Sequence, residues 1–349
     1  MFVFLLFILN IVFAIPSYKR DLSFDAQHEY TNTIDIIWDS FWNHQQQAIS
    51  AHSSCSNGSF SSAVIWDLAV AAKPIIDSGN VARTNLIMNN LYNYQNIIGW
   101  FAATPDSSQI YTDDNAQVLW AYLDAYELTH NTRYLTTAIQ IMTLLQTQWS
   151  QRGGILWQVD ASYIASISTT EAALSAVRLY EYTHDSNLLT FATNCIDWMN
   201  ANLRDPSDGF YYDGIGSANG STPNKGKLTY TVGTVISTYT YLAKYNMLPN
   251  ALSSAITLAT NSLTSNTFLT NGFWNNQVQY IHLLFAGFGD LIKIGGQTSF
   301  INQVNDQGNY YYQMNPVSYN LPCQGGGQGT LLYDGSMAQI FYQLSRINS

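Results

Sequence analysis

A ten-residue segment that occurs twice limits the fold of this 349-residue chain more than any other feature of its sequence. The first copy covers residues 126–135 and the second covers residues 180–189, 54 positions further along. In both copies a polar turn separates two amphipathic helical patterns, which cover residues 116–126, 136–148, 170–180 and 190–202. The repeated unit is therefore a helical hairpin. His130 and His184 occupy equivalent places in the two turns, so we expect both to be structural residues.

The same unit can be fitted to most of the remaining chain. Residues 64–76 and 81–92 flank one polar turn, residues 232–243 and 251–263 flank another, and two further pairs fit before residue 50 and after residue 278. A periodic array must bury each unit against its neighbours. The sequence therefore predicts an all-α fold, an (α/α)6 toroid or barrel of about six hairpins, which forms a single domain over residues 21–349. Two separate domains are the alternative, but no Pro-, Ser- or Gly-rich linker divides the chain.

Uncharged polar and aromatic residues take the place that ions usually have in a globular chain. Charged residues make up 10% of the sequence and aromatic residues 14%, and the formal net charge is −10. A chain so rich in aromatic residues is not expected to be disordered. An acidic chain without a stripe of Lys or Arg is poorly suited to nucleic acid. Loops rich in Gly, Asn and Asp, at residues 151–154, 205–226 and 322–329, are where a toroid would build its binding face.

The N-terminal segment has the features of a secretory signal. Residues 2–15 form one apolar run, which is too short to span a membrane and fits the central part of a signal peptide cleaved near Ala14. No Lys or Arg precedes the run, and a buried first helix is the alternative. Lys19 and Arg20 offer a second, dibasic cleavage site. We therefore expect residues 1–20 to be removed from a secreted protein, and the polar C-terminus argues against a lipid anchor.

Sequons and cysteines agree with secretion. Asn57 and Asn219 each begin an Asn-Gly-Ser sequon, so both are expected glycosylation sites. The three cysteines allow at most one disulfide, and Cys55 with Cys323 is the expected pair because Cys195 lies in a helical pattern. No spacing in the chain is typical of a zinc site, so we expect no metal and no cofactor.

The adjacent aspartates Asp113 and Asp114 open the helical pattern of the first repeat. Acidic residues at a helix start commonly cap free N–H groups, and this is the structural interpretation. One cap needs only one carboxylate, however, and two neighbouring carboxylates shielded from water raise the pKa of one of them. Such a pair supplies an acid and a base together, as glycoside hydrolysis requires. We expect the first aspartate to have non-helical backbone angles, so that both side chains can face one cleft.

Several motifs in order make the chain resemble glycoside hydrolase family 76, the endo-α-1,6-mannanases of bacteria and fungi. The matching segments are Asp113 with Asp114, Gly153 to Trp157 in the loop after the next helix, residues 173–180 with the turn at 183–185, Asp213 with Gly214, and Thr229 with Tyr230 and Gly233. Together these segments cover most of the chain from about residue 100 onward.

This resemblance implies an (α/α)6 barrel and a retaining reaction. In that reaction Asp113 would attack the anomeric carbon and Asp114 would serve as the acid and base. Asp213 would hold hydroxyl groups of the sugar next to the cleaved bond, and Trp157 and Tyr230 would provide stacking or hydrogen-bonding surfaces. A buried core ring is the structural alternative for Trp157, and an aspartate that forms a turn before glycine is the alternative for Asp213.

A few positions depart from the family's usual pattern. Gln158 stands where family members have a carboxylate, and Gln117 stands where they often have an aromatic residue. Thr231 and Val232 replace an Asn-Gln pair. We expect these positions to line the groove, with Gln158 among the substrate-binding residues, so the departures bear on the preference for α-1,6-mannan.

The sequence therefore predicts a secreted, retaining glycoside hydrolase that cleaves α-1,6-linked mannan or a related cell-wall mannose polymer. We expect it to act as a monomer without a membrane span, either free outside the cell or attached to the cell wall. A glycan-binding wall protein that has lost activity is one alternative. A transglycosidase, in which a sugar instead of water intercepts the covalent intermediate, is another.

Overall fold

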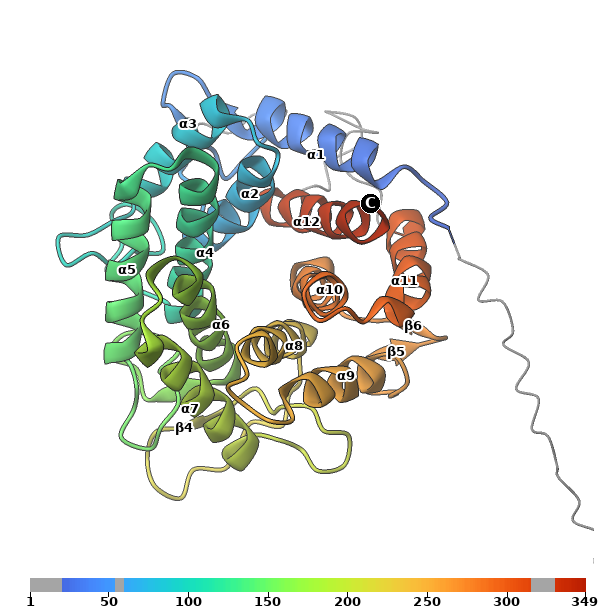
Figure 1. Ribbon diagram of the computed structural model, residues 1–349. Coiled ribbons are helices and arrows are strands. Elements are labelled where there is room, and N and C mark those ends of the chain that lie inside the picture. Colours follow the sequence, from blue (N-terminus) through green and yellow to red (C-terminus); the bar gives the residue numbers. More distant parts are fainter. Residues whose placement is uncertain (1–20, 54–59, 315–329) are drawn as a thin grey trace, which may run out of the picture.

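The computed structural model describes residues 21–53, 60–314 and 330–349. In this part of the chain, twelve α-helices alternate between the inner and the outer layer of a ring (Figure 1). The inner helices are α2 (Ile65–Asp77), α4 (Thr112–Thr129), α6 (Ser166–Thr183), α8 (Thr229–Lys244), α10 (Val278–Lys293) and α12 (Leu331–Asn348). The outer helices are α1 (Ala26–Phe41), α3 (Val81–Tyr92), α5 (Thr132–Thr147), α7 (Ser186–Asn202), α9 (Ala251–Ser262) and α11 (Ile301–Met314). The predicted all-α toroid is confirmed.

The ring is closed by helices from both ends of the chain. Each inner helix packs on the next inner helix, and α12 packs on α2 to complete the circle. The sixth pair consists of α12 and α1, which lie side by side (Figure 1). Our assignment of one hairpin before residue 50 is therefore wrong. The described chain begins in the outer layer with α1, so its partner had to come from the C-terminus.

The repeated turns have the same geometry in both copies. His130 ends α4 and His184 ends α6, each with a left-handed backbone (φ 54°) and an N–H group that bonds the carbonyl oxygen four residues earlier. Asn131 and Asp185 then cap α5 and α7 with their side-chain oxygens. The two histidines thus occupy the same C-cap position, and their role in the repeat is structural.

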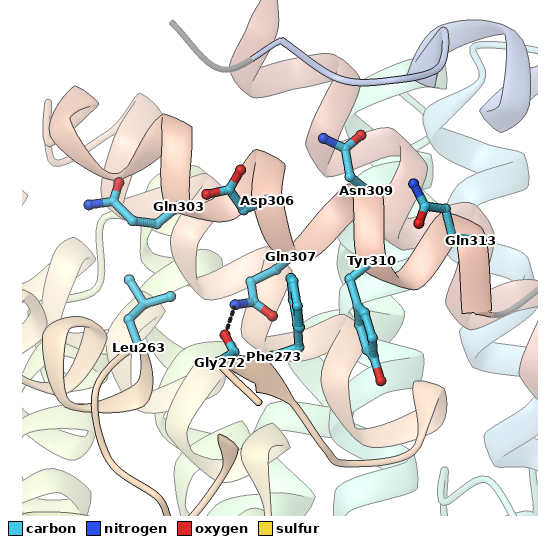
Figure 2. A pocket seen from close by; sticks show the side chains of 9 residues that line it. All are labelled: Leu263, Gly272, Phe273, Gln303, Asp306, Gln307, Asn309, Tyr310 and Gln313. Atoms are coloured by element: carbon cyan, nitrogen blue, oxygen red, sulfur yellow. Dashed lines mark hydrogen bonds between the residues drawn. The ribbon is translucent and has the colours of Figure 1, made fainter. Parts of the chain in front are cut away.

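Short strands lie in the loops between helices. The antiparallel pairs are β1 (Trp42–Asn43) with β2 (Ala48–Ile49), β3 (Tyr163–Ala165) with β4 (Gly214–Gly216), and β5 (Leu269–Thr270) with β6 (Phe273–Trp274). A 3-10 turn, Thr298–Phe300, precedes α11. Beside β6 and α11 lies a hollow of about 490 Å³, in which Phe273 stacks on Tyr310 and Gln307 donates a hydrogen bond to the carbonyl oxygen of Gly272 (Figure 2).

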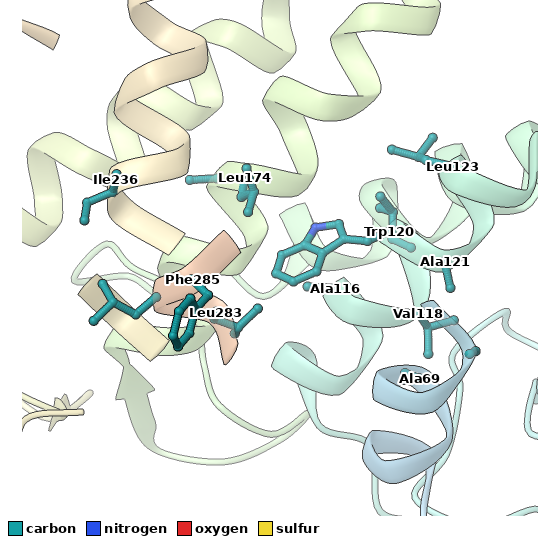
Figure 3. Close-up of a cluster of buried hydrophobic side chains, with 14 of the residues drawn as sticks. Ala69, Ala116, Val118, Trp120, Ala121, Leu123, Leu174, Ile236, Leu283 and Phe285 are labelled. Carbon is teal, nitrogen blue, oxygen red and sulfur yellow. The ribbon is translucent and has the colours of Figure 1, made fainter. Parts of the chain in front are cut away.

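Apolar side chains fill the middle of the ring. Trp120 of α4 extends toward Leu174 of α6 and Leu283 of α10 (Figure 3), and its indole N–H donates to Ser175 Oγ at 2.9 Å. Gly233 and Gly287 let α8 and α10 approach closely, because a Cβ atom at Gly233 would lie 2.0 Å from the carbonyl oxygen of Leu283. Among the described residues, the middle of the ring is therefore a packed core.

Ion pairs cross between inner helices at the end of the barrel where these helices terminate. Asp124 of α4 accepts from Lys73 of α2 at 2.7 Å and from Arg178 of α6, and Arg346 of α12 pairs with Asp290 of α10 at 3.1 Å. Because oppositely charged partners surround Asp124, they hold its pKa below the ordinary value despite burial. In the described segments, no helix has both the length and the apolar character needed to cross a membrane.

Candidate active site

A cavity of about 440 Å³ opens at the end of the ring where the inner helices begin. Its lining comes from the first two turns of α2, α4, α6, α8 and α10 and from the loops that lead into α4 and α6. The hollow in Figure 2 has a single carboxyl group, that of Asp306, in its lining. The cavity at the helix starts has two adjacent carboxyl groups, and it is therefore the candidate active site.

The start of each of four inner helices is held by the loop that leads into the next inner helix. The first backbone N–H of the helix donates to an oxygen of that loop. The four bonds run from Ile65 to the carbonyl of Ala103 (2.9 Å), from Thr112 to that of Trp157 (2.9 Å), from Ser166 to that of Asp213 (2.8 Å) and from Thr229 to Oδ1 of Asn276 (3.0 Å). These bonds satisfy N–H groups that a helix cannot pair internally. They also hold Trp157 and Asp213 beside the starts of α4 and α6.

Asp113 and Asp114 both lie in the first turn of α4, and both line the cavity. The helix begins at Thr112, and Tyr111 precedes it with extended backbone angles (φ −100°, ψ 134°). Our expectation that Asp113 lies outside the helix is therefore wrong, and neither aspartate is the N-cap residue. Both face the cavity because α4 meets it end-on, so successive residues of the first turn border the same space.

Two hydrogen-bond donors hold the carboxylate of Asp113. The backbone N–H of Asp114 donates to its Oδ1 at 3.1 Å, and the indole N–H of Trp157 donates to its Oδ2 at 3.1 Å. Burial raises the pKa of Asp113 to about 6, while these donors counteract the rise by stabilising the charged form. Asp113 is therefore the carboxyl of the pair that is better prepared to carry a negative charge.

Asp114 has the opposite environment. Its carboxyl group accepts no hydrogen bond from the described residues, and no Lys, Arg or His among them lines the cavity. Burial raises the pKa of Asp114 well above its ordinary value, and the charges of Asp113 and Asp67 raise it further. Asp67 lies in the first turn of α2, and burial raises its own pKa to about 6. A proton shared by the pair therefore resides on Asp114.

Aromatic rings surround the two carboxyl groups. Trp157 is 40% exposed and its ring lies 5.0 Å from that of Tyr111, so the interpretation as a buried core ring is wrong. Tyr230, of α8, meets Tyr280 edge to face at 5.3 Å, and Tyr280 stacks against Trp66 at 6.4 Å. All five rings line the cavity and offer apolar surface beside polar groups.

Sequence reasoning found Trp157 and Tyr230 but missed Trp66 and Tyr280. A signal for them was present, because both occupy the first turn of an inner helix, as Tyr230 does. Aligning the starts of all inner helices would have selected them.

Asp213 lies near the cavity but is not part of its lining. Its Oδ2 accepts from the hydroxyl of Tyr163 at 2.6 Å and from the amide of Asn224 at 3.0 Å. The next residue, Gly214, has no room for a side chain, because a Cβ atom there would lie 2.4 Å from the carbonyl oxygen of Ile164. The Asp-Gly motif therefore allows β3 and β4 to approach closely, and a role of Asp213 in holding the sugar stays a prediction.

The four positions that the sequence analysis expected to line the groove divide into two groups. Gln117 lines the cavity, whereas Gln158 pairs its backbone with Tyr111 outside the lining, and its contact with substrate stays a prediction. Our expectation that Thr231 and Val232 line the groove is wrong. Both are buried in the barrel wall, where the hydroxyl of Thr231 lies 3.1 Å from that of Ser166 on α6.

Secretion features lie partly outside the described residues. The signal peptide, one sequon and the disulfide stay predictions, because the described residues do not include residues 1–20, Asn57, Cys55 or Cys323. Asn219 lies in an exposed turn, and Cys195 is a buried free thiol of α7. In the part of the chain that the structure describes, no group of three or more His, Cys, Asp or Glu side chains is arranged to hold a metal ion.

Comparison with known proteins gives matches over almost the whole chain. The pattern of glycosyl hydrolase family 76 matches residues 26–336. A curated relative, the meiotically up-regulated gene 191 protein of Schizosaccharomyces pombe, is 26% identical in an alignment over 242 residues, and the match covers 62% of this chain and 54% of the relative. The chain thus spans about half the length of that relative.

Solved structures share the fold. A family 76 glycoside hydrolase from a Bacteroides thetaiotaomicron strain has a TM-score of 0.79 at 15% identity and covers 94% of this chain and 79% of its own. An inactive variant of an α-1,6-mannanase from Salegentibacter sp. HEL1_6, in which two successive aspartates are replaced by asparagine, was solved with α-1,6-mannotriose. It has a TM-score of 0.77 at 20% identity and covers 93% of this chain and 100% of its own.

Proposed function

The chain belongs to glycosyl hydrolase family 76, and from this premise we propose that the protein is a secreted, retaining glycosidase that cleaves internal linkages of α-1,6-linked mannan. The observation that carries the proposal is the unequal environment of two adjacent carboxyl groups in one cavity. Asp113 receives two hydrogen-bond donors, and Asp114 receives none from the described residues. The Salegentibacter mannanase that is inactive after loss of two successive aspartates supports a catalytic role for the pair.

In the first step, Asp113 attacks the anomeric carbon while Asp114 gives its proton to the departing glycosidic oxygen. A covalent glycosyl ester on Asp113 results. In the second step, Asp114, now ionised, takes a proton from water, and the water oxygen attacks the same carbon and releases Asp113. Retaining enzymes need carboxyl groups about 5–5.5 Å apart, and neighbours on one helical turn suit that distance better than the 6.5–9.5 Å of inverting enzymes.

The lining of the cavity suits a neutral sugar. Aromatic faces can stack against the apolar side of a pyranose ring, and the described lining offers no cation that would recognise an acidic sugar. Trp157 and Tyr230 would contact the sugars on either side of the cleaved bond. Asp213 would act from behind this lining, through its bonds to Tyr163 and Asn224.

Purified protein incubated with linear α-1,6-mannan tests the proposal. We expect short mannose oligosaccharides, with the α anomer as the first product in proton NMR, and no release by the Asp113→Asn variant. Release of the β anomer first would contradict the retaining assignment. Binding of mannotriose without any product would favour the glycan-binding alternative, and products longer than the substrate would favour the transglycosidase.

A further inference from the structure

A completely buried carboxyl group lies in the barrel wall beside Asp113 and Asp114. Glu171, in the second turn of α6, is completely buried, and its Oε1 accepts a hydrogen bond from Nε2 of Gln117 at 3.0 Å. Its Oε2 has no partner among the described residues. Carboxyl groups are rarely buried unless a cation or several donors compensate the charge. Glu171 has one amide donor, so its environment suits the neutral acid.

The charges near Glu171 also favour its neutral form. Asp113 and Asp114 face it from α4, and Tyr230 faces it from α8. The nearest cation on its own helix, Arg178, lies two turns further along and is bonded to Asp124. Burial, followed by the charge of Asp113, raises the pKa of Glu171 well above its ordinary value. Glu171 therefore carries its proton when Asp113 is charged, and it presents a carbonyl oxygen to Gln117.

Gln117 connects Glu171 to the cavity. It follows Asp113 by four positions and Asp114 by three, so all three side chains share one face of α4. The amide nitrogen of Gln117 bonds Glu171 in the wall. Its amide oxygen accepts no hydrogen bond from the described residues, yet it is not enclosed, because the side chain borders the cavity. The two ends of the amide therefore have different surroundings, with the donor inside the wall and the acceptor at the sugar site.

We propose that Glu171 is a positioning residue that acts through Gln117: it fixes the amide so that the oxygen of Gln117 faces the cavity and accepts a hydrogen bond from a sugar hydroxyl group. The inference rests on the proposed function, since it needs a sugar in this cavity. An unrestrained amide could turn over and present its NH2 group instead, which cannot accept a hydroxyl proton. With its proton on Oε2, away from the amide, Glu171 offers Oε1 as the acceptor on the wall side, and this pairing leaves the amide oxygen of Gln117 toward the cavity.

Four variants test this assignment: Glu171→Leu, Gln117→Leu, the double variant, and Glu171→Gln as the conservative control. Glu171→Leu and Gln117→Leu should each lower kcat/KM on α-1,6-mannan about fivefold to tenfold, the effect of one hydrogen bond. The double variant should lose no more than either single variant, because both changes remove the same contact. Glu171→Gln keeps an acceptor of the same size, so it should restore activity to within about twofold.

Two further readouts separate positioning from a purely structural role. Thermal unfolding of each variant reports whether the wall is still packed, and Glu171→Gln should match the wild type. The acidic limb of its pH profile should also stay in place, because one neutral group replaces another. A shift of that limb to lower pH would mean that Glu171 is charged in the working enzyme and would overturn the proposal.

The outcomes also separate this inference from the proposed function. If wild-type protein cleaves mannan but the losses of the two single variants multiply in the double variant, only the positioning role is wrong. If the wild type binds α-1,6-mannotriose without cleaving it, the catalytic proposal is wrong. The same variants measured by titration calorimetry then decide the role of Glu171. If the wild type neither cleaves nor binds, both proposals are wrong.

Discussion

Replacing Trp157 by Phe should move the acidic limb of the activity profile to higher pH. The indole N–H of Trp157 is one of the two donors that stabilise the charge on Asp113. The proposed reaction requires ionised Asp113, whose pKa burial has raised to about 6, so kcat/KM should fall as the pH drops through that value. Phenylalanine keeps an aromatic face but has no donor. The charged form of Asp113 loses support, its pKa rises, and the limb follows.

The size of the shift follows from the energy of the bond. A hydrogen bond to a charged group contributes about 1.5–3 kcal/mol, and 1.36 kcal/mol corresponds to about one pH unit. Trp157 is 40% exposed, so solvent weakens the contact and the lower end applies. We expect the limb to move upward by about one pH unit, with kcat/KM near its original value on the plateau.

The assay is kcat/KM on α-1,6-mannan oligosaccharides between pH 4 and 8. Trp149→Phe is the matched control, because Trp149 is 37% exposed and packs on Phe191 away from the cavity. That variant should leave the limb unchanged. A Trp157→Phe variant that loses activity equally at every pH would refute the reasoning, since Trp157 would then bind sugar without supporting the charge of Asp113.

Four further predictions follow from the described contacts. Asp113→Asn should lower kcat by roughly a thousandfold or more on every substrate, whereas Asp114→Asn should retain far more activity on an activated aryl mannoside with azide, and equal loss in both would contradict this assignment of roles. Asp113→Asn should raise the melting temperature by a few degrees at pH 7.5 but not at pH 4. The raised pKa of Asp113 destabilises the folded state by an amount that is absent below about pH 4 and complete above about pH 6, and asparagine removes it. Calorimetry at both pH values measures this. Gly233→Ala should cost about 1–3 kcal/mol in chemical denaturation, while the loop control Gly226→Ala, which meets no atom closer than 3.4 Å, should be neutral. Sequencing the secreted protein should give an N-terminus between Ile15 and Asp21, and an intact Met1 outside the cell would contradict the signal peptide.

The repeat was enough to predict the fold because it reports on local structure and on packing together. Each hairpin has a polar turn at a fixed place, and the left-handed histidine caps make that turn recognisable at residues 130 and 184. The sequence did not predict the sixth pair because its helices, α1 and α12, lie at opposite ends of the chain. No local pattern marks that pairing, and only closure of the ring requires it.

The candidate site was predictable where chemistry leaves a local signature and not where it depends on three-dimensional contacts. Two adjacent aspartates at a helix start are visible in any sequence. The partners that make them unequal are not, because Trp157 reaches Asp113 from a loop 44 residues further along. The prediction that Thr231 lines the groove was wrong for the same reason. A residue in the first turn of an inner helix can face either the cavity or the neighbouring helix, and its position around the helix axis decides which.

The hydrogen bonds at the helix starts fix the backbone around Asp113 and Asp114 without using the side chains of the first turn. Each of four inner helices delivers its first backbone N–H to the loop that leads into the next inner helix, so the position of that loop depends on backbone atoms of the helix. The side chains of the first turn are then free to differ: α4 has carboxyl groups there, α8 and α10 have tyrosines, and α2 has a tryptophan. A substitution of Gln117, which lines the cavity, should therefore alter what the cavity presents to a sugar without moving Asp113 and Asp114. Specificity should change more readily than chemistry in a barrel built this way.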